Sequence, residues 1–283
     1  MVLESLINPV EAEIHPNKLL FHGFLYSSIG LLLANWVFNE HTSLVMVFLT
    51  SLAAIPLVFN IIKREEKKEL TDLSEFNILN EHSRAINVFL NYFIGATLGF
   101  AFWYVLLPDH SISEIFLVQT NTILDIRTGG VVGHVTRLSQ FSSILANNTK
   151  VLIFCILFSF LYGVGAIFIL TWNASVIGVA IGETIRRGII EIEKDLHINL
   201  HVHYIGVISH GLFRYVIHGI PEILSYFIAG LAGSIISMAA VRHDFGTKMF
   251  EKILLDSTVL LLISFVFVLV AAFLEVYITP MIF

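Results

Sequence analysis

The sequence predicts an all-α protein, a polytopic transmembrane helical bundle of about six or seven spans, with re-entrant or broken helices in its C-terminal half. Hydrophobic residues make up 56% of the 283 residues and charged residues only 13%, and the mean hydropathy is +0.83. Several apolar runs reach the roughly 20 residues that a helix needs to cross a bilayer. The whole chain, 1–283, is therefore expected to form a single integral membrane domain.

The N-terminal half is expected to supply three spans. Residues 19–62 hold two apolar runs separated by a short turn, so they predict an antiparallel helical hairpin. Residues 63–84 form a charged linker, typical of a solvated helix end on the cytoplasmic side. The third span is expected over 85–107.

The middle of the chain is less regular. Residues 108–148 form the longest polar segment, which is expected to be an outer loop packed over one face of the bundle. A fourth span is expected over 151–172. The apolar run that follows is too short to cross a bilayer before it becomes charged, so 174–187 is predicted to be a re-entrant or interfacial helix.

Three further spans complete the expected bundle, over 200–217, 222–241 and 253–278. Gly219 and Pro221 separate the first two, because a proline removes a helical hydrogen bond and is expected to break the helix there. Small residues at helical spacing let neighbouring helices approach closely. Such positions are Gly95, Gly99, Gly178, Gly182, Gly230 and Gly233.

Basic residues predict the orientation of the chain, since they are enriched on the cytoplasmic side. With a cytoplasmic N-terminus and seven crossing segments, twelve lysine and arginine residues face inside, and only Arg127, Arg137 and Lys150 face outside. The sequence therefore predicts a multi-pass protein of the cell membrane with its N-terminus in the cytoplasm.

Four ionisable residues at four-residue spacing mark the main candidate site. His210, Arg214, His218 and Glu222 would share one face of a helix in a segment that otherwise reads as a membrane span. A charged side chain at the bilayer centre costs about 2.5–3.5 kcal/mol or more, so this stripe needs partners or a purpose. The break at Pro221 divides it into a short helix and a new helix that starts at Glu222.

Three interpretations of the stripe remain open. The first is a closed polar network that holds a broken helix together. The second is a binding pocket for an ion, a solute or a lipid headgroup, as in a transporter or channel-like module. Its candidate residues are Glu183, Arg186, Arg187, His210, Arg214, His218 and Glu222.

The third interpretation is an intramembrane metal-dependent hydrolase. His210, His218 and Glu222 are of the residue types that bind zinc, although their spacing is poor for it. A separate cluster, His197, His201 and His203, favours a wet interfacial face over a metal site. The sequence has no phosphate-binding loop and no dinucleotide fingerprint. We therefore expect no enzyme activity and no cofactor, with zinc as the alternative.

The C-terminal half also resembles a known family. Asn147-Asn-Thr149 opens an apolar helix, and a turn at Asn173 leads into the helix with Gly178 and Gly182. His218-Gly-Ile-Pro-Glu222 and Ile228-Ala-Gly-Leu-Ala-Gly233 follow. This order, over about 145–241, resembles the stage II sporulation protein M family of multi-pass membrane proteins.

The resemblance implies a membrane scaffold, because such proteins work with a peptidoglycan-degrading enzyme and its anchor in spore-forming bacteria. We therefore expect a non-enzymatic scaffold or assembly partner of this type. The outer loop 108–148 and the glycine faces would be its contact surfaces. The expected partners are the lipid bilayer, other membrane or cell-envelope proteins and a second copy of the chain in a homodimer, and not nucleic acid.

Overall fold

The computed structural model describes residues 9–69, 78–128, 136–162, 164–194, 200–242 and 246–282. Some side chains within its helices lie outside the description, namely those of 9–10, 66–69, 78–81, 126–128, 162, 191–194 and 200–216. The described residues are almost entirely helical, and no strand occurs among them. This confirms the predicted all-α class.

Seven of the described helical segments are long and apolar enough to cross a membrane, which confirms the predicted polytopic bundle. They are Asn17–Val37, Asn39–Glu65, His82–Leu106, Arg137–Leu161, Ala166–Ile190, Ile217–Val241 and Lys248–Ile282. The protein is therefore a multi-pass membrane protein.

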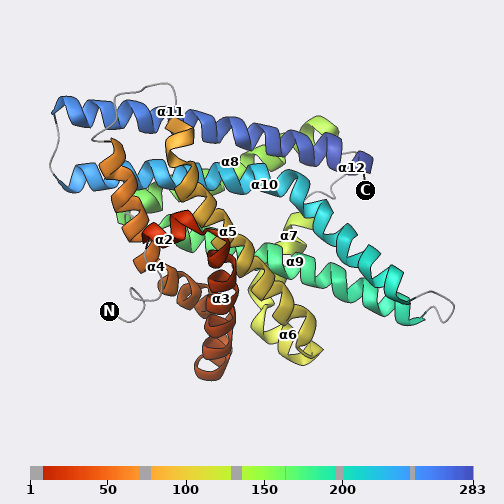
Figure 1. Ribbon diagram of the computed structural model, residues 1–283. Coiled ribbons are helices and arrows are strands. Elements are labelled where there is room, and N and C mark those ends of the chain that lie inside the picture. Colours follow the sequence, from red (N-terminus) through yellow and green to blue (C-terminus); the bar gives the residue numbers. More distant parts are fainter. Residues whose placement is uncertain are drawn as a thin grey trace.

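Helices labelled in Figure 1 follow one another with short connections. The N-terminal elements are α2 (Pro9–Ile14), α3 (Asn17–Val37), the 3₁₀ turn η1 (Asn39–His41), α4 (Thr42–Glu69) and α5 (Ile78–Leu106). The middle elements are α6 (Asp109–Ile115), α7 (Leu117–Thr128), α8 (Arg137–Tyr162) and α9 (Ala166–Lys194). The last are α10 (Leu200–Val241), α11 (Lys248–Phe273), the π-helical turn η2 (Leu274–Ile278) and α12 (Thr279–Ile282).

The spans of α5, α9 and α10 form the centre of the bundle. Their apolar windows are 67%, 61% and 78% buried, against 22% for α8 and 33% for α11. Phe227 of α10 packs against two rings of α5, stacked on Phe89 and edge-on to Phe93. The outer helices instead expose large hydrophobic side chains, as expected where a bundle meets lipid. Examples are Phe21, Trp36, Leu138, Leu161, Leu255 and Leu262.

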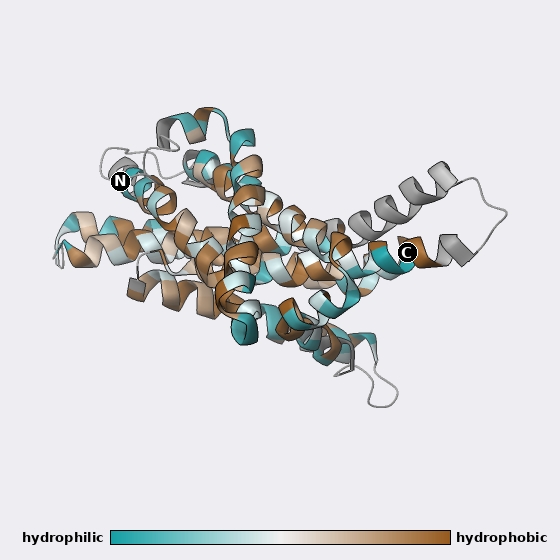
Figure 2. Ribbon diagram, turned by 90° about the horizontal axis from the view of Figure 1, so that it is seen from below, coloured by the Kyte–Doolittle hydropathy of each residue, from teal (hydrophilic) through white to brown (hydrophobic). Residues whose placement is uncertain are grey.

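Hydrophobic positions run along most of the helices (Figure 2). The short helix α2 is fixed to the start of α3 by an ion pair of 2.5 Å between Lys18 Nζ and Glu11 Oε1. The hydrogen bond from Lys18 holds the pKa of the Glu11 carboxyl below its ordinary value.

Glycines lie where the central helices cross. A Cβ on Gly95 would meet the backbone of Leu20, so α3 and α5 touch through their main chains there. A Cβ on Gly178 would lie 2.8 Å from the carbonyl oxygen of Thr97, so α9 also packs closely against α5. The other predicted positions are also at helix contacts, with Gly99 against α3, Gly182 against Tyr104 of α5, Gly230 against Ala166 of α9, and Gly233 against Ile156 and Ser159 of α8.

The boundary between the fourth and fifth spans differs from the prediction. The expected span over 151–172 is divided, because α8 ends at Tyr162 and α9 begins at Ala166. Asn147 and Asn173, expected at a helix start and a turn, lie inside α8 and α9. Asn173 does not end its helix, since its Nδ2 donates to the carbonyl of Ile169 one turn earlier at 2.8 Å.

The predicted re-entrant segment over 174–187 is also wrong in its bounds. It forms the middle of α9, a continuous helix of 29 residues that includes the candidate span Ala166–Ile190. The apolar run before the charges looked too short because the sequence interpretation assigned its first part to the preceding span.

The predicted break at Gly219 and Pro221 is a bend in one continuous helix. α10 runs for 42 residues with Pro221 inside it, and Figure 1 shows that its two halves point in different directions. Pro221 cannot donate to the carbonyl of Ile217, and its ring crowds that carbonyl, so the helix bends without ending. Glu222 therefore does not start a new helix.

Candidate functional site

The predicted outer loop contains a helical corner, α6–α7, that is packed into the bundle. Ile115 and Phe116, at the turn between the two helices, are 1% and 0% exposed. The Phe116 ring lies 5.3 Å from the ring of Tyr104 on α5. Aromatic and aliphatic burial thus fixes this corner against the helices beneath it.

A buried polar network fixes the same corner. Ser43, at the start of α4, donates through Oγ to the carbonyl of Ile115 at 2.7 Å. Gln119 of α7 donates through Nε2 to the Ser43 carbonyl at 3.0 Å and to Ser175 Oγ of α9 at 3.2 Å. Because Gln119 is fully buried, these bonds replace water at its amide nitrogen. One side chain therefore joins α4, α7 and α9.

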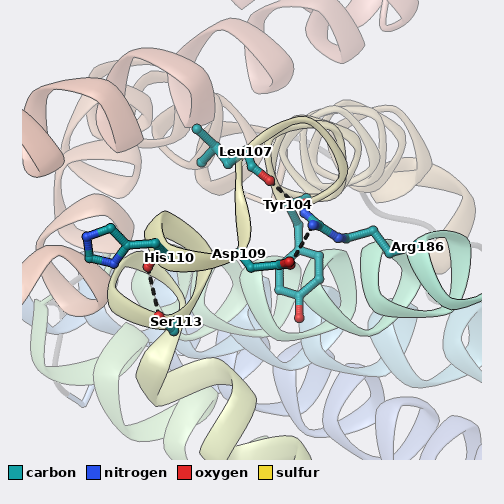
Figure 3. A network of polar contacts seen from close by, with 6 residues as sticks. All are labelled: Tyr104, Leu107, Asp109, His110, Ser113 and Arg186. Carbon is teal, nitrogen blue, oxygen red and sulfur yellow. Dashed lines mark hydrogen bonds and ion pairs between the residues drawn. The ribbon is translucent and has the colours of Figure 1, made fainter. Parts of the chain in front are cut away.

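Arg186, in the C-terminal half of α9, is the centre of a second network of hydrogen bonds and an ion pair, shown in Figure 3. Its Nη1 donates to the carbonyl of Leu107 at 2.6 Å and to that of Tyr104 at 3.3 Å. Its Nη2 makes an ion pair of 2.5 Å with Asp109 of α6. The last carbonyls of a helix are unpaired and partly negative, so a guanidinium is well suited to the end of α5.

The two other predicted site residues of α9, Glu183 and Arg187, pair with each other. Arg187 Nη2 lies 3.1 Å from Glu183 Oε1, one helical turn away. The Arg187 side chain is 57% exposed, so this pair contributes little to stability.

The bend of α10 holds a third group of polar side chains. Glu222 Oε1 accepts a hydrogen bond of 3.0 Å from the hydroxyl of Tyr226, and Tyr226 is fully buried. His218 Nδ1 lies 3.4 Å from Thr279 Oγ1 at the C-terminal end of the chain. Figure 1 shows α12 and the C-terminus beside this bend.

The structure therefore divides the predicted pocket. Glu183, Arg186 and Arg187 belong to the end of α9, and Arg186 pairs with α5 and α6. His218 and Glu222 belong to the α10 bend. The side chains of His210 and Arg214, and those of the cluster His197, His201 and His203, lie outside the described residues. Whether the pocket binds a ligand stays a prediction.

The metal hypothesis also stays a prediction, because one of its three residues, His210, lies outside the description. Among the described side chains, no group of three or more histidines, cysteines and carboxylates is arranged to hold a metal ion.

A buried pair at the opposite end of the bundle was not predicted. His82 Nδ1 of α5 lies 2.6 Å from Glu65 Oε2 of α4, and both side chains are fully buried. Beside Glu65 in the sequence, Arg64 lies 3.4 Å from the buried Glu13 of α2. Both pairs sit in a segment that the sequence presented only as a charge-rich linker, and their partners are distant in sequence.

These features define the class of the protein, an all-α multi-pass membrane protein. The corner α6–α7 packs against its helices, and the Glu65–His82 pair is buried between α4 and α5. The family model described as stage II sporulation protein M matches residues 88–280, more than half of the chain, and the chain belongs to this family. The match confirms the resemblance seen over 145–241 and extends it in both directions. No curated protein and no solved structure matches the chain.

Proposed function

We propose that this protein is a non-enzymatic membrane scaffold and that α6–α7 is the platform on which a cell-envelope partner docks. The observation that carries the proposal is the anchoring of this corner. Gln119 and Phe116 fix it to the helices beneath it, and Arg186 bonds to the carbonyl of Leu107 just before it. A surface held in one conformation loses little conformational entropy when it binds a partner.

The outer face of α6 carries polar groups suited to such a contact. The side chains of Asp109, His110 and Glu114 are 93%, 83% and 63% exposed. The corner that carries them is bonded to α4 and α9, so a partner would meet these charges on a backbone held in one place. A scaffold role is also what the resemblance to the stage II sporulation protein M family implies.

The described interior gives the transporter alternative no comparable support. A cavity between α4, α5, α9 and α10 has a volume of about 20 Å³, room for one water molecule. Its lining is apolar apart from Ser234. We assign it a packing role.

We also propose that the N-terminus is cytoplasmic. If the seven candidate spans cross in succession, nine lysine and arginine residues fall on the N-terminal side and six on the other, with Lys150 inside α8. The excess is smaller than the sequence alone indicated, because the end of α9 moves to the outer side with Arg186, Arg187 and Lys194. The direction is unchanged.

Site-specific photocrosslinking in native cells tests the platform. A photoreactive residue at His110 or Glu114 is expected to give one discrete protein adduct, and the substitution Glu114→Lys is expected to reduce a crosslink from position 110. A matched probe at Glu251, an exposed residue at the start of α11, should give none. Equal crosslinking from all three positions, or none from α6, would remove the support for the proposal.

A further inference from the structure

The bend of α10 lies against a second irregular helical turn. η2 is a π-helical turn, and the hydroxyl of Thr279 donates to the carbonyl of Leu274, five residues earlier, at 3.1 Å. Thr279 also lies 3.4 Å from His218, which precedes Pro221 by three residues. The two irregular turns therefore face each other, and π-helical turns occur frequently at functional sites.

The bend of α10 and the π-helical turn η2 each carry a glutamate within a candidate membrane span. Glu222 lies in the candidate span Ile217–Val241, and Glu275 lies in Lys248–Ile282. α10 and the α11–η2 segment run side by side in opposite directions, and His218 meets Thr279 between them. Glu222, one turn after His218, and Glu275, one turn before Thr279, therefore lie at the same level on facing sides of the two segments. Tyr226 donates to Glu222, which supplies one hydrogen bond but no positive charge.

A third side chain, Asn148 of α8, is directed to the same place by helical register. Phe141, Asn148 and Cys155 are spaced seven residues apart and so share one face of α8. Phe141 contacts Tyr277 of η2, with ring centroids 6.4 Å apart, and Ile156, beside Cys155, meets Gly233 of α10. Asn148, midway between them, therefore faces the region where Glu222 and Glu275 meet.

Asn148 is an unusual residue in this position. It is only 4% exposed, and its Nδ2 has no hydrogen-bond acceptor among the described residues. Buried polar groups normally have partners, so a donor without one on this face of α8 needs an explanation. It is explained if one of the carboxyl groups carries a negative charge that the amide can approach.

Among the described side chains, few titratable groups lie around the pair. α10 contributes His218 and Tyr226, η2 contributes Tyr277, and α8 contributes Cys155. The facing part of α9, residues 166–182, contains no titratable side chain. α5 meets this stretch of α10 with phenylalanine rings. The side chain of Arg214, two turns before Glu222, lies outside the described residues.

We propose that Glu222 and Glu275 form an intramembrane proton-binding site in which the two carboxyl groups share one proton. Two like charges at close range inside a membrane cannot both persist without a compensating charge. Binding one proton to a carboxylate oxygen changes the charge of the pair from two negative charges to one. The hydroxyl of Tyr226 and the amide of Asn148 then serve the carboxylate that remains ionised.

Infrared spectroscopy of the purified full-length protein in detergent tests the site. The wild-type protein is expected to show a protonated-carboxyl band near neutral pH that shifts in D₂O and disappears in alkaline buffer. Both Glu222→Gln and Glu275→Gln should lose it, because the remaining carboxyl no longer faces a second charge. Glu114→Gln, on the exposed face of α6, is the matched control and should keep the band.

Each other outcome overturns the proposal. Loss of the band in Glu222→Gln alone would show one protonated glutamate and no sharing. A band unchanged in both variants would place the protonated group elsewhere. A band that sodium removes at constant pH would show a metal cation at the site. Thermal unfolding of the same samples shows that the variants are folded, and the wild-type melting temperature should fall as the pH rises, more than in either variant.

Discussion

Arg186 reaches from α9 to the main-chain carbonyl of Leu107, at 2.6 Å, and so closes the end of α5 with a charge from a helix 79 residues away. The same guanidinium pairs with Asp109, the first residue of α6. α5, α6 and α9 are therefore joined at one point, and the two kinds of contact at that point can be separated by mutation.

Arg186→Gln is expected to destabilise the protein by about 1.5–3 kcal/mol, the usual contribution of hydrogen bonds to a charged group. Asp109→Asn should have a much smaller effect, because the Asp109 side chain is 93% exposed and water replaces its partner. Thermal unfolding in one detergent compares the two variants. Equal losses of stability in the two variants would show that Arg186 stabilises the protein through its ion pair with Asp109 and not by capping α5.

Gly95→Ala should destabilise the bundle by about 1–3 kcal/mol, because an added Cβ overlaps the Leu20 backbone and forces α3 away from α5. Gly219→Ala is the matched control. No described atom lies within 4 Å of a Cβ built there, so alanine should be neutral or stabilise the helix by about 0.4–1 kcal/mol. Unfolding measurements on both variants, made in parallel, test the contrast. A stable Gly95→Ala protein would contradict the close crossing.

Replacing one partner of the Glu65–His82 pair is predicted to cost about 3–5 kcal/mol, because the other polar group stays buried without its contact. A double-mutant cycle with Glu65→Leu and His82→Leu measures the interaction. The double variant should lose clearly less stability than the sum of the single losses. Additive losses would mean that the two side chains act independently.

Gln119→Leu is predicted to loosen the α6–α7 corner without unfolding the bundle, since it removes the bonds to Ser43 and Ser175. The probe is a cysteine in place of the buried Ile112, in a protein whose single native cysteine is replaced by Cys155→Ser. Maleimide labelling of this cysteine should become faster in the Gln119→Leu background. Glu114→Gln supplies the control and should leave the rate unchanged.

The sequence predicted the class and the family because both depend on features that repeat along the chain. Apolar length predicts spans wherever they lie, and the glycine and His-Gly-x-x-Glu patterns carried the family resemblance. The span boundaries in the middle of the chain were harder to predict. Apolar residues continue through the connection between α8 and α9, and the polar Thr171 and Asn173 bond back to carbonyls of their own helix, so they do not mark a helix end.

The candidate site was predicted in part. Residues four apart on one helix can be found from spacing, and His218 and Glu222 both lie at the α10 bend. Contacts between residues far apart in sequence could not be found from spacing. Nothing in the local sequence around Asp109, Gln119 or Asn148 indicates which helix each of them will meet. Pro221 misled the prediction in another way. A proline inside a long apolar helix bends it when neighbouring helices hold both halves, and those neighbours are not visible in the local sequence.

The continuity of α10 through its bend has a mechanical consequence. The segment from Leu200 to Pro221 forms a straight arm of about 30 Å, at 1.5 Å per residue. A change of about 10° at Pro221 would therefore displace Leu200 by about 5 Å. A small rearrangement at Pro221, where α10 meets the C-terminus, would thus become a large displacement of the N-terminal end of α10.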